Sequence, residues 1–210
     1  MTGPTHRQYS ICFGLITLII LYTYNITNVN YYLALLIILM ASKSGALFPD
    51  VDHHWDAVHD KTVVNKVINT IIHLTGGKHR SWQTHSIDIC TCFTVTSYLI
   101  PNMLYDNELI TNINKEVLLL LMLGFASGWV SHLFSDMLTS AGVRLICFIP
   151  KLKIKLVPKK IGKLKFNTGH EWENFNFRII KVLKIVLGVY TLIYPILTSN
   201  MLINIIEKWR

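Results

Sequence analysis

Histidine and aspartate residues occur in this chain at spacings that suit metal coordination. In the segment WVSHLFSDMLTSAG, His132 and Asp136 are four residues apart. On a helix this spacing puts both side chains on one face, one turn from each other, so together they can hold a metal ion. The same spacing also suits a hydrogen bond between imidazole and carboxylate without any metal. The pair alone does not separate these two interpretations.

A second group lies in GALFPDVDHH, where an apolar run ends in acidic residues and histidines. Pro49 disfavours a helical conformation at the residue before it. We therefore expect Asp50 and Asp52 in an extended turn, with both carboxylates on one side of the chain as metal ligands. The alternative is an ordinary turn or helix cap. His53, directly after Asp52, is a candidate for a catalytic role beside the ligands.

A third group lies in GGKHRSWQTHSID. His79 and His85 are six residues apart, a spacing that does not place them on one helix face, so one of them must come from a loop. Arg80 lies between them. Its guanidinium can bind a phosphoryl oxygen through two parallel hydrogen bonds, or it can pair with a lipid phosphate. Arg80 is therefore our candidate for binding an anionic substrate.

The elements that must position these groups are membrane helices. Of the 210 residues, 51% are hydrophobic and 15% are charged, against roughly 25% charged residues in an ordinary soluble domain. We expect one domain over residues 1–210, an all-α polytopic membrane helical bundle with about four or five embedded helices of about 20 apolar residues each. The apolar blocks are Ser10–Tyr24, Tyr31–Phe48, Ile87–Leu104, Val117–Ser135 and Ile179–Ile206.

Lysine and arginine predict the orientation, because short loops rich in these residues stay in the cytoplasm. They are concentrated in Ala41–His85 and Arg144–Arg178, whereas Asn25–Asn30 has none and Asp106–Glu116 has only Lys115. Since two helices separate successive basic loops, we expect these loops and the N-terminus on one, cytoplasmic, face. The metal-ligand candidates collect on that face: His6, Asp50, Asp52, His79, His85, His132 and Asp136.

The remaining histidines and the cysteines are expected to have other roles. His73 lies on an amphipathic pattern and is interpreted as structural, and His54 and His59 as surface residues. The cysteines form neither a CxxC pair nor a disulfide framework, so we expect small core residues rather than a zinc ribbon. They are Cys12, Cys90, Cys92 and Cys147.

The segment Lys151–Phe166 (KLKIKLVPKKIGKLKF) has a composition of its own. Its first half alternates lysine with apolar residues, which favours a strand, and Pro158–Gly162 favours a turn. We therefore expect a small basic hairpin on the cytoplasmic face. It either attracts anionic lipid headgroups and does nothing more, or it contacts an anionic substrate.

Three motifs in this order and spacing resemble the signatures of the YdjM-type membrane-bound metal-dependent hydrolases of bacteria: GALFPDVDHH, KHRSWQTHS and GWVSHLFSDMLTSAGVRLICFIP. The resemblance runs from about His6 to Glu173 and implies the bacterial inner membrane. Phe48 stands where the family has leucine, and His170 where a small residue is common. The family pattern falls on Thr5 and His6; Pro49, Asp50, Asp52 and His53; His79, Arg80, Thr84, His85 and Ser86; Ser131, His132, Asp136, Thr139 and Gly142; and Thr168, Gly169 and Glu173.

The ligand types indicate the metal and the chemistry. Mixed imidazole and carboxylate ligands favour zinc, with manganese or iron as alternatives. The candidates outnumber the four ligands of one structural zinc, which favours two or more ions that share a bridging carboxylate. The hypothesis is a membrane-bound metal-dependent hydrolase, in which a metal-activated water attacks a phosphoester or similar ester, lipid-linked or soluble. No serine or cysteine nucleophile is evident, so we expect no covalent intermediate.

Other functional classes fit less well. A metal transporter would place ionisable residues near the middle of the bilayer, but the middles of the apolar blocks are nearly free of charge. Nucleic acid is not expected as a partner, because the topology already accounts for the net charge of +8 and no recognition motif accompanies it. The alternative that stays open is a non-catalytic membrane protein with a structural metal site or a polar network.

Overall fold

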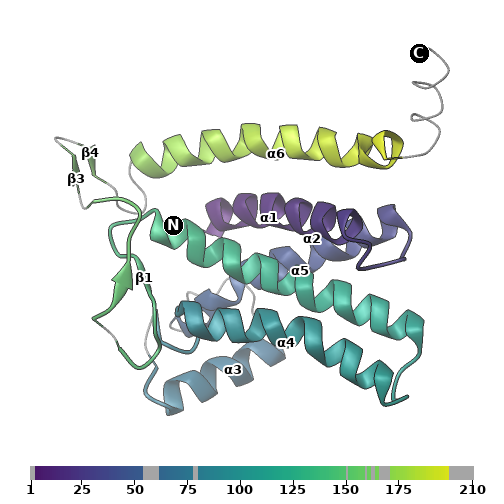
Figure 1. Ribbon diagram of the computed structural model, residues 1–210. Helices are drawn as coiled ribbons and strands as arrows, with labels where there is room; N and C mark the ends of the chain where they lie inside the picture. Colours follow the sequence, from purple (N-terminus) through teal and green to yellow (C-terminus); the bar gives the residue numbers. More distant parts are fainter. Residues whose placement is uncertain are drawn as a thin grey trace.

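The computed structural model describes residues 3–53, 62–77, 80–149, 151–158, 160–161, 164–165 and 171–198. The structure is an all-α bundle with short strands at one end (Figure 1). The helices are α1 (Gly3–Thr23), α2 (Tyr31–Leu47), the 3-10 helix η1 (Pro49–Asp52), α3 (Val63–Leu74), α4 (Ile87–Asp106), α5 (Asn112–Met137) and α6 (Glu171–Leu197). The strands are β1 (Val143–Arg144), β2 (Lys153–Ile154), β3 (Lys160–Ile161) and β4 (Leu164–Lys165).

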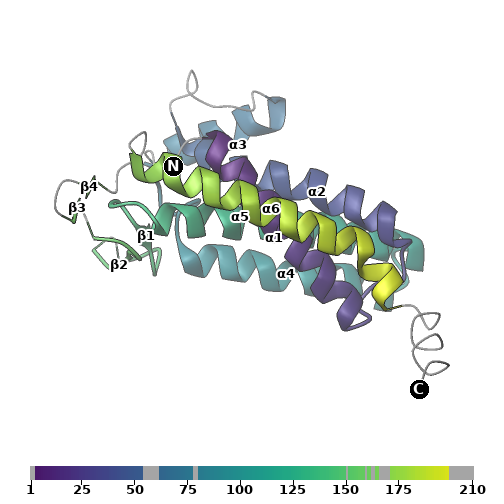
Figure 2. The ribbon, with the colours of Figure 1, turned by 90° about the horizontal axis from the view of Figure 1, so that it is seen from above.

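The long helices pack into one bundle (Figure 1), in which α1 crosses α6 at an angle (Figure 2). Among the described residues, four segments are long and apolar enough to cross a membrane: Tyr31–Asp52, Ile87–Asp106, Asn112–Met137 and Glu171–Leu197. The outer face of α6 exposes aliphatic side chains such as Val182, Ile185 and Val189, which suits contact with lipid. The expected membrane helical bundle is therefore confirmed.

Helix α1 lies against α2, α5 and α6. It begins at Gly3, whereas the apolar block alone predicted a start at Ser10. The extra turns are polar, yet Thr5 and His6 are buried there. They are accommodated because their side chains bond to other helices: Thr5 Oγ1 donates to Glu173 Oε1 at 2.8 Å, and His6 Nδ1 lies 2.6 Å from Ser135 Oγ.

Helices α2 and α5 approach each other very closely. A Cβ atom at Gly45 would lie 2.0 Å from the carbonyl oxygen of Phe125, and one at Gly128 would lie 2.0 Å from that of Ser42. Only glycine allows two helix backbones to come this near. The close approach brings the carbonyl of Ala46 against α5 at the position of His132.

The basic segment differs in detail from the expected hairpin. Its alternating first half does form a strand, β2. The partner of β2 is the antiparallel strand β1, which precedes the basic segment in the chain. Gly142 allows this pairing, because its positive φ of 66° turns the chain between the end of α5 and β1. A separate hairpin, β3–β4, follows, and β3 begins inside the predicted turn Pro158–Gly162. The chain thus forms two small hairpins at the end of the bundle that holds its N-terminus (Figure 2).

The substitution Gly128→Ala should destabilise the protein. The new methyl group would lie 2.0 Å from a backbone oxygen that cannot move without separating α2 from α5. Overpacking of this kind costs about 1–3 kcal/mol, of which the better helix propensity of alanine offsets at most ~1 kcal/mol. Thermal unfolding in detergent, followed by tryptophan fluorescence, measures the change.

Gly188→Ala is the matched control, because no described atom beyond the adjacent residues and the local backbone of α6 lies within 4 Å of a Cβ at that position. It should leave the unfolding temperature unchanged or raise it. Equal unfolding temperatures for Gly128→Ala and the wild type would contradict the close contact between α2 and α5.

Candidate metal centre

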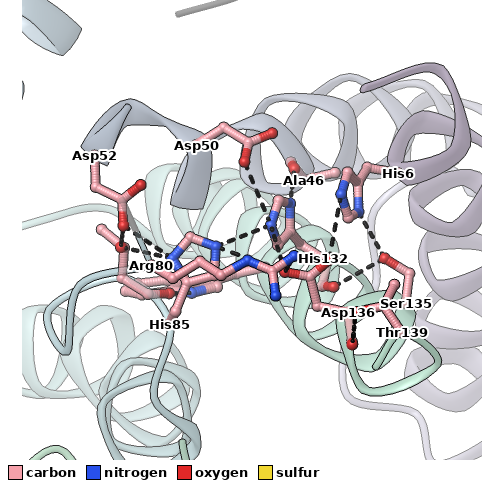
Figure 3. Close-up of polar contacts among 12 residues, drawn as sticks. His6, Ala46, Asp50, Asp52, Arg80, His85, His132, Ser135, Asp136 and Thr139 are labelled. Carbon is pink, nitrogen blue, oxygen red and sulfur yellow. Dashed lines mark hydrogen bonds and ion pairs between the residues drawn. The ribbon is translucent and has the colours of Figure 1, made fainter. Parts of the chain in front are cut away.

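The predicted gathering of ligand-type residues at one end of the bundle is observed for the residues that the structure describes (Figure 3). His6 lies in the first turns of α1 and His85 directly before α4. Asp50 and Asp52 lie in the 3-10 helix η1, so the expected extended turn is wrong. The last turns of α5 carry His132 and Asp136. These segments are far apart in the sequence, and their side chains meet in a single buried cluster. His79 lies outside the described residues.

His132 is at the centre of this cluster and is fully buried. Its Nδ1 atom lies 2.7 Å from the carbonyl oxygen of Ala46. A carbonyl oxygen only accepts, so Nδ1 carries the proton of the neutral ring and Nε2 carries a lone pair. That Nε2 atom lies 3.3 Å from Nε2 of His85.

Asp52 determines in the same way which ring nitrogen of His85 carries the proton. Its Oδ2 atom lies 3.0 Å from His85 Nδ1, which donates to it and therefore leaves the lone pair on Nε2. The same oxygen accepts the backbone N–H of Ser81 and the hydroxyl of Thr84, both at 2.7 Å. Asp52 thus lies behind His85 as its orienting carboxylate, the arrangement typical of metal-bound histidines.

The contact between the two Nε2 atoms has a chemical consequence. Two nitrogen lone pairs that face each other at 3.3 Å repel unless a proton or a metal cation lies between them. Because the opposite nitrogen of each ring is held by an acceptor, both rings present their lone pairs to the same space. This is the donor arrangement that a metal ion requires.

His6 contributes a third imidazole. Its ring stacks on that of His132, with centroids 3.8 Å apart and an interplanar angle of 9°. Ser135 donates its hydroxyl to the carbonyl of His132 at 2.9 Å, so its oxygen is left to accept from His6 Nδ1. The Nε2 atom of His6 then carries a lone pair and lies 3.7 Å from Asp136 Oδ1.

The two oxygens of Asp136 face different neighbours. Oδ1 faces His6, whereas Oδ2 lies 3.8 Å from His85 Nε2 and 3.9 Å from His132 Nε2. A carboxylate with this placement can bridge two metal ions. Asp50 approaches from the other side, with its Oδ1 atom 3.7 Å from His132 Nε2.

Among the residues that the structure describes, two groups of three have ligand atoms within 4.8 Å of one another: His6, His132 and Asp136; and Asp50, His85 and His132. Zinc binds such atoms at about 2.0–2.2 Å, so two ligands of one tetrahedral ion lie roughly 3.3–3.6 Å apart. The separations from His132 Nε2 to His85, Asp50 and Asp136, 3.3 to 3.9 Å, are close to that range. The residues present therefore fit a zinc-type metal.

Arg80 lies at the edge of the cluster, with Nη2 3.3 Å from Asp136 Oδ2. Its backbone is in the left-handed region, with φ of 61°, and the next N–H, that of Ser81, is bound by Asp52. Its Nη1 atom is buried without a hydrogen-bond partner among the described residues. The guanidinium therefore retains donors for an anion beside the cluster.

The other histidines have the following places. His53 is 34% exposed, and its Nε2 atom lies 3.7 Å from Asp50 Oδ1. His73 lies between two carbonyl oxygens, with Nδ1 3.1 Å from Gly77 O and Nε2 3.4 Å from His53 O. These contacts are structural, as the amphipathic pattern predicted. His54 and His59 lie outside the described residues.

Several supporting groups were not predicted as part of the site. Ser135 follows His132 by three residues, so helical spacing places it on the same face and could have identified it. The Ala46 carbonyl has no sequence signal, because every residue carries a carbonyl. Glu173, part of the family pattern, accepts from Thr5 at 2.8 Å and so fastens the start of α1 beside α6. Thr168 and Gly169 lie outside the described residues.

Asp50 and Asp52 should differ in their effect on the metal-free protein. Asp52→Asn should lower the free energy of unfolding by about 2–3 kcal/mol, since three buried donors lose a charged acceptor. Asp50→Asn should change it by less than about 0.5 kcal/mol, because within the described part of the chain the Asp50 carboxylate has only 3.7 Å contacts, to His53 and His132. Unfolding in the presence of a chelator measures both. A larger loss for Asp50→Asn than for Asp52→Asn would contradict these assignments.

Comparison with known proteins gives one family. No curated protein and no solved structure matches the chain. The family model described as YdjM inner membrane protein matches residues 1–203, nearly the whole chain, and its description agrees with the apolar helices of the bundle. The chain is therefore a member of the YdjM inner membrane protein family.

Proposed function

We propose that the protein is a membrane-bound metal-dependent hydrolase that cleaves a phosphoester at the cytoplasmic face of the membrane. The observation that carries this proposal is the convergence of three imidazole Nε2 atoms and two buried carboxylates. The hydrogen bonds behind the rings of His85 and His132 hold their lone pairs towards one another. A polar network without a metal would need a proton between these two Nε2 atoms, 3.3 Å apart, and one ring would then be a buried imidazolium.

The ligand set suits zinc, with manganese or iron as alternatives. The residues that would hold the metal are His6, His132 and Asp136 in one candidate group and Asp50, His85 and His132 in the other. His132 is common to both groups and its Nδ1 is already bound to the Ala46 carbonyl, so only its Nε2 would bind a metal. Bound metal of this kind lowers the pKa of a coordinated water towards 7 and stabilises charge on the oxygens of a phosphoester.

The residues around the ligands support direct attack by water. The hydroxyl groups nearest the cluster are already bonded: Ser135 to His132 and His6, and Thr84 to Asp52. Neither is left as a nucleophile, which favours a mechanism without a covalent intermediate. Arg80 would hold the anionic group, since its Nη1 has donors to offer. The partly exposed His53 would protonate the leaving oxygen.

The main competing function is a structural metal site without catalysis. One observation favours it: the ligand side chains are buried, with His6, His85 and His132 at most 2% exposed. Arg80 favours the hydrolase, because a purely structural site gains nothing from a cation that competes with the metal for Asp136. Measurements of metal content and turnover together separate the two functions.

Metal content provides the first test. Wild-type protein purified in detergent should contain at least one zinc-type ion per chain, and the double variant Asp50→Asn/His132→Ala should contain much less, because it removes two ligands of one ion. Inductively coupled plasma mass spectrometry measures both. Wild-type protein with less than one metal per chain would refute the site. Ser127→Ala, a buried α5 substitution away from the ligands, is the control for general damage.

Turnover provides the second part of that test. Wild-type protein should hydrolyse a phosphoester, chelation should abolish the reaction, and added zinc should restore it. Arg80→Lys should raise KM more than it lowers kcat, because the fork that binds the anion is lost while the positive charge remains. Metal-loaded protein that hydrolyses none of a panel of phosphoesters and phospholipids would favour the structural site.

The cytoplasmic orientation can be tested independently. The site end carries the basic strands, so a cysteine in place of Lys155 should be shielded from a membrane-impermeant thiol reagent added to intact cells. A cysteine in place of Leu109, which is exposed at the opposite end between α4 and α5, should be labelled. The reverse pattern would overturn the orientation and leave the metal site intact.

A further inference from the structure

Helix α3 has two faces of different character. One face is turned inward and includes Asn69 and Ile72, both buried. The opposite face exposes aliphatic side chains, each between 54% and 82% accessible. These residues recur at helical spacing and form one stripe, which we call the α3 apolar face: Val63, Val67, Ile71 and Leu74.

The inward face binds the segment that carries the site carboxylates. Asn69 donates its side-chain amide to the carbonyl oxygens of Val51 and His53, which flank Asp52. His73 adds a contact to the same His53 carbonyl. The position of η1, and with it that of Asp50, therefore depends on where α3 lies.

Nothing in the described part of the chain covers the α3 apolar face. In both views α3 lies at the end of the bundle that holds the N-terminus and the metal centre (Figures 1 and 2). The spanning helices expose aliphatic side chains of the same kind, so lipid already surrounds this bundle. A short amphipathic helix with an aliphatic stripe and a lysine at its edge, here Lys66, is typical of helices in the membrane interface.

A second feature at this end has interfacial character. Trp82, 38% exposed, stacks on Phe148, which is 84% exposed. Aromatic side chains of this kind are enriched at the headgroup level of membranes. Trp82 follows Arg80 by two residues, so this member of the aromatic pair and the candidate anion-binding side chain belong to one segment. Exposed lysines in and around β2 add positive charge suited to anionic lipid.

We propose that α3 lies in the membrane interface with its apolar face in contact with lipid, an arrangement we call the lipid seat. This contact holds the Asp50 segment at the membrane surface. The inference about the substrate rests on the proposed function: the substrate is a membrane lipid that carries a phosphoester. Its acyl chains stay beside α3 while its phosphate reaches Arg80. A water-soluble phosphoester would gain nothing from this arrangement.

The lipid seat is tested by spin labels in the full-length protein. Single cysteines at Val67, Ile71 and Lys66 are labelled in a Cys92→Ser background, because Cys92 is the exposed cysteine in the described structure. The protein is placed in vesicles of phosphatidylethanolamine and phosphatidylglycerol. Labels at Val67 and Ile71 should collide more with oxygen than with a water-soluble nickel complex, and the label at Lys66 should show the reverse. Preferential collision with the nickel complex at all three positions would overturn the seat.

The substrate class is tested by comparing two phosphoesters. Val67→Asp/Ile71→Asp should lower hydrolysis of phosphatidic acid in vesicles by about tenfold or more, because two aliphatic contacts with lipid are lost. Hydrolysis of p-nitrophenyl phosphate should remain, because Asn69 still binds the Val51 and His53 carbonyls and keeps η1 attached to α3 in this variant. Lys66→Gln is the matched control on the same helix. Equal losses with both esters would refute the lipid substrate. Wild-type protein inactive on every ester would refute the hydrolase, and the spin labels would still decide the seat.

Discussion

The site depends on the close approach of α2 to α5. Glycines at 45 and 128 let the two backbones come near enough for the Ala46 carbonyl to accept from His132 Nδ1 at 2.7 Å. That bond determines which nitrogen of the buried ring carries the proton, and it turns Nε2 towards the other ligands. Without it, His132 would be a histidine in an apolar core with either nitrogen available to any partner.

The other ligands are positioned around this ring by the same principle. Each of the three imidazoles has its Nδ1 held by an acceptor: a carbonyl, a carboxylate or a serine hydroxyl. Their Nε2 atoms then face Asp50 and Asp136 across 3.7 to 3.9 Å. Ligand orientation is thus decided by groups that do not themselves reach the centre, as is common around metal sites.

The bundle also shows why the ends of the chain matter to the site. His6 reaches the centre because polar bonds fasten the start of α1: Thr5 binds Glu173, and Tyr9 donates to Asn176 Oδ1 at 3.4 Å. Both partners belong to α6, more than 160 residues further along the chain. Helix α6 therefore exposes aliphatic side chains on one side and, on the other, fastens the start of α1, which carries His6.

The sequence by itself determined the helices and the end at which the chemistry lies. Apolar blocks long enough for a bilayer predict spanning helices, and the basic loops put the ligand candidates at one end, as observed for those described. Hydropathy placed the start of α1 too late, because Thr5 and His6 are polar and their partners are remote in sequence. Only the tertiary structure separated Asp50, which faces His132, from Asp52, which orients His85. Two residues with the same chemistry in one turn differ in their neighbours, and those neighbours come from α4 and α5.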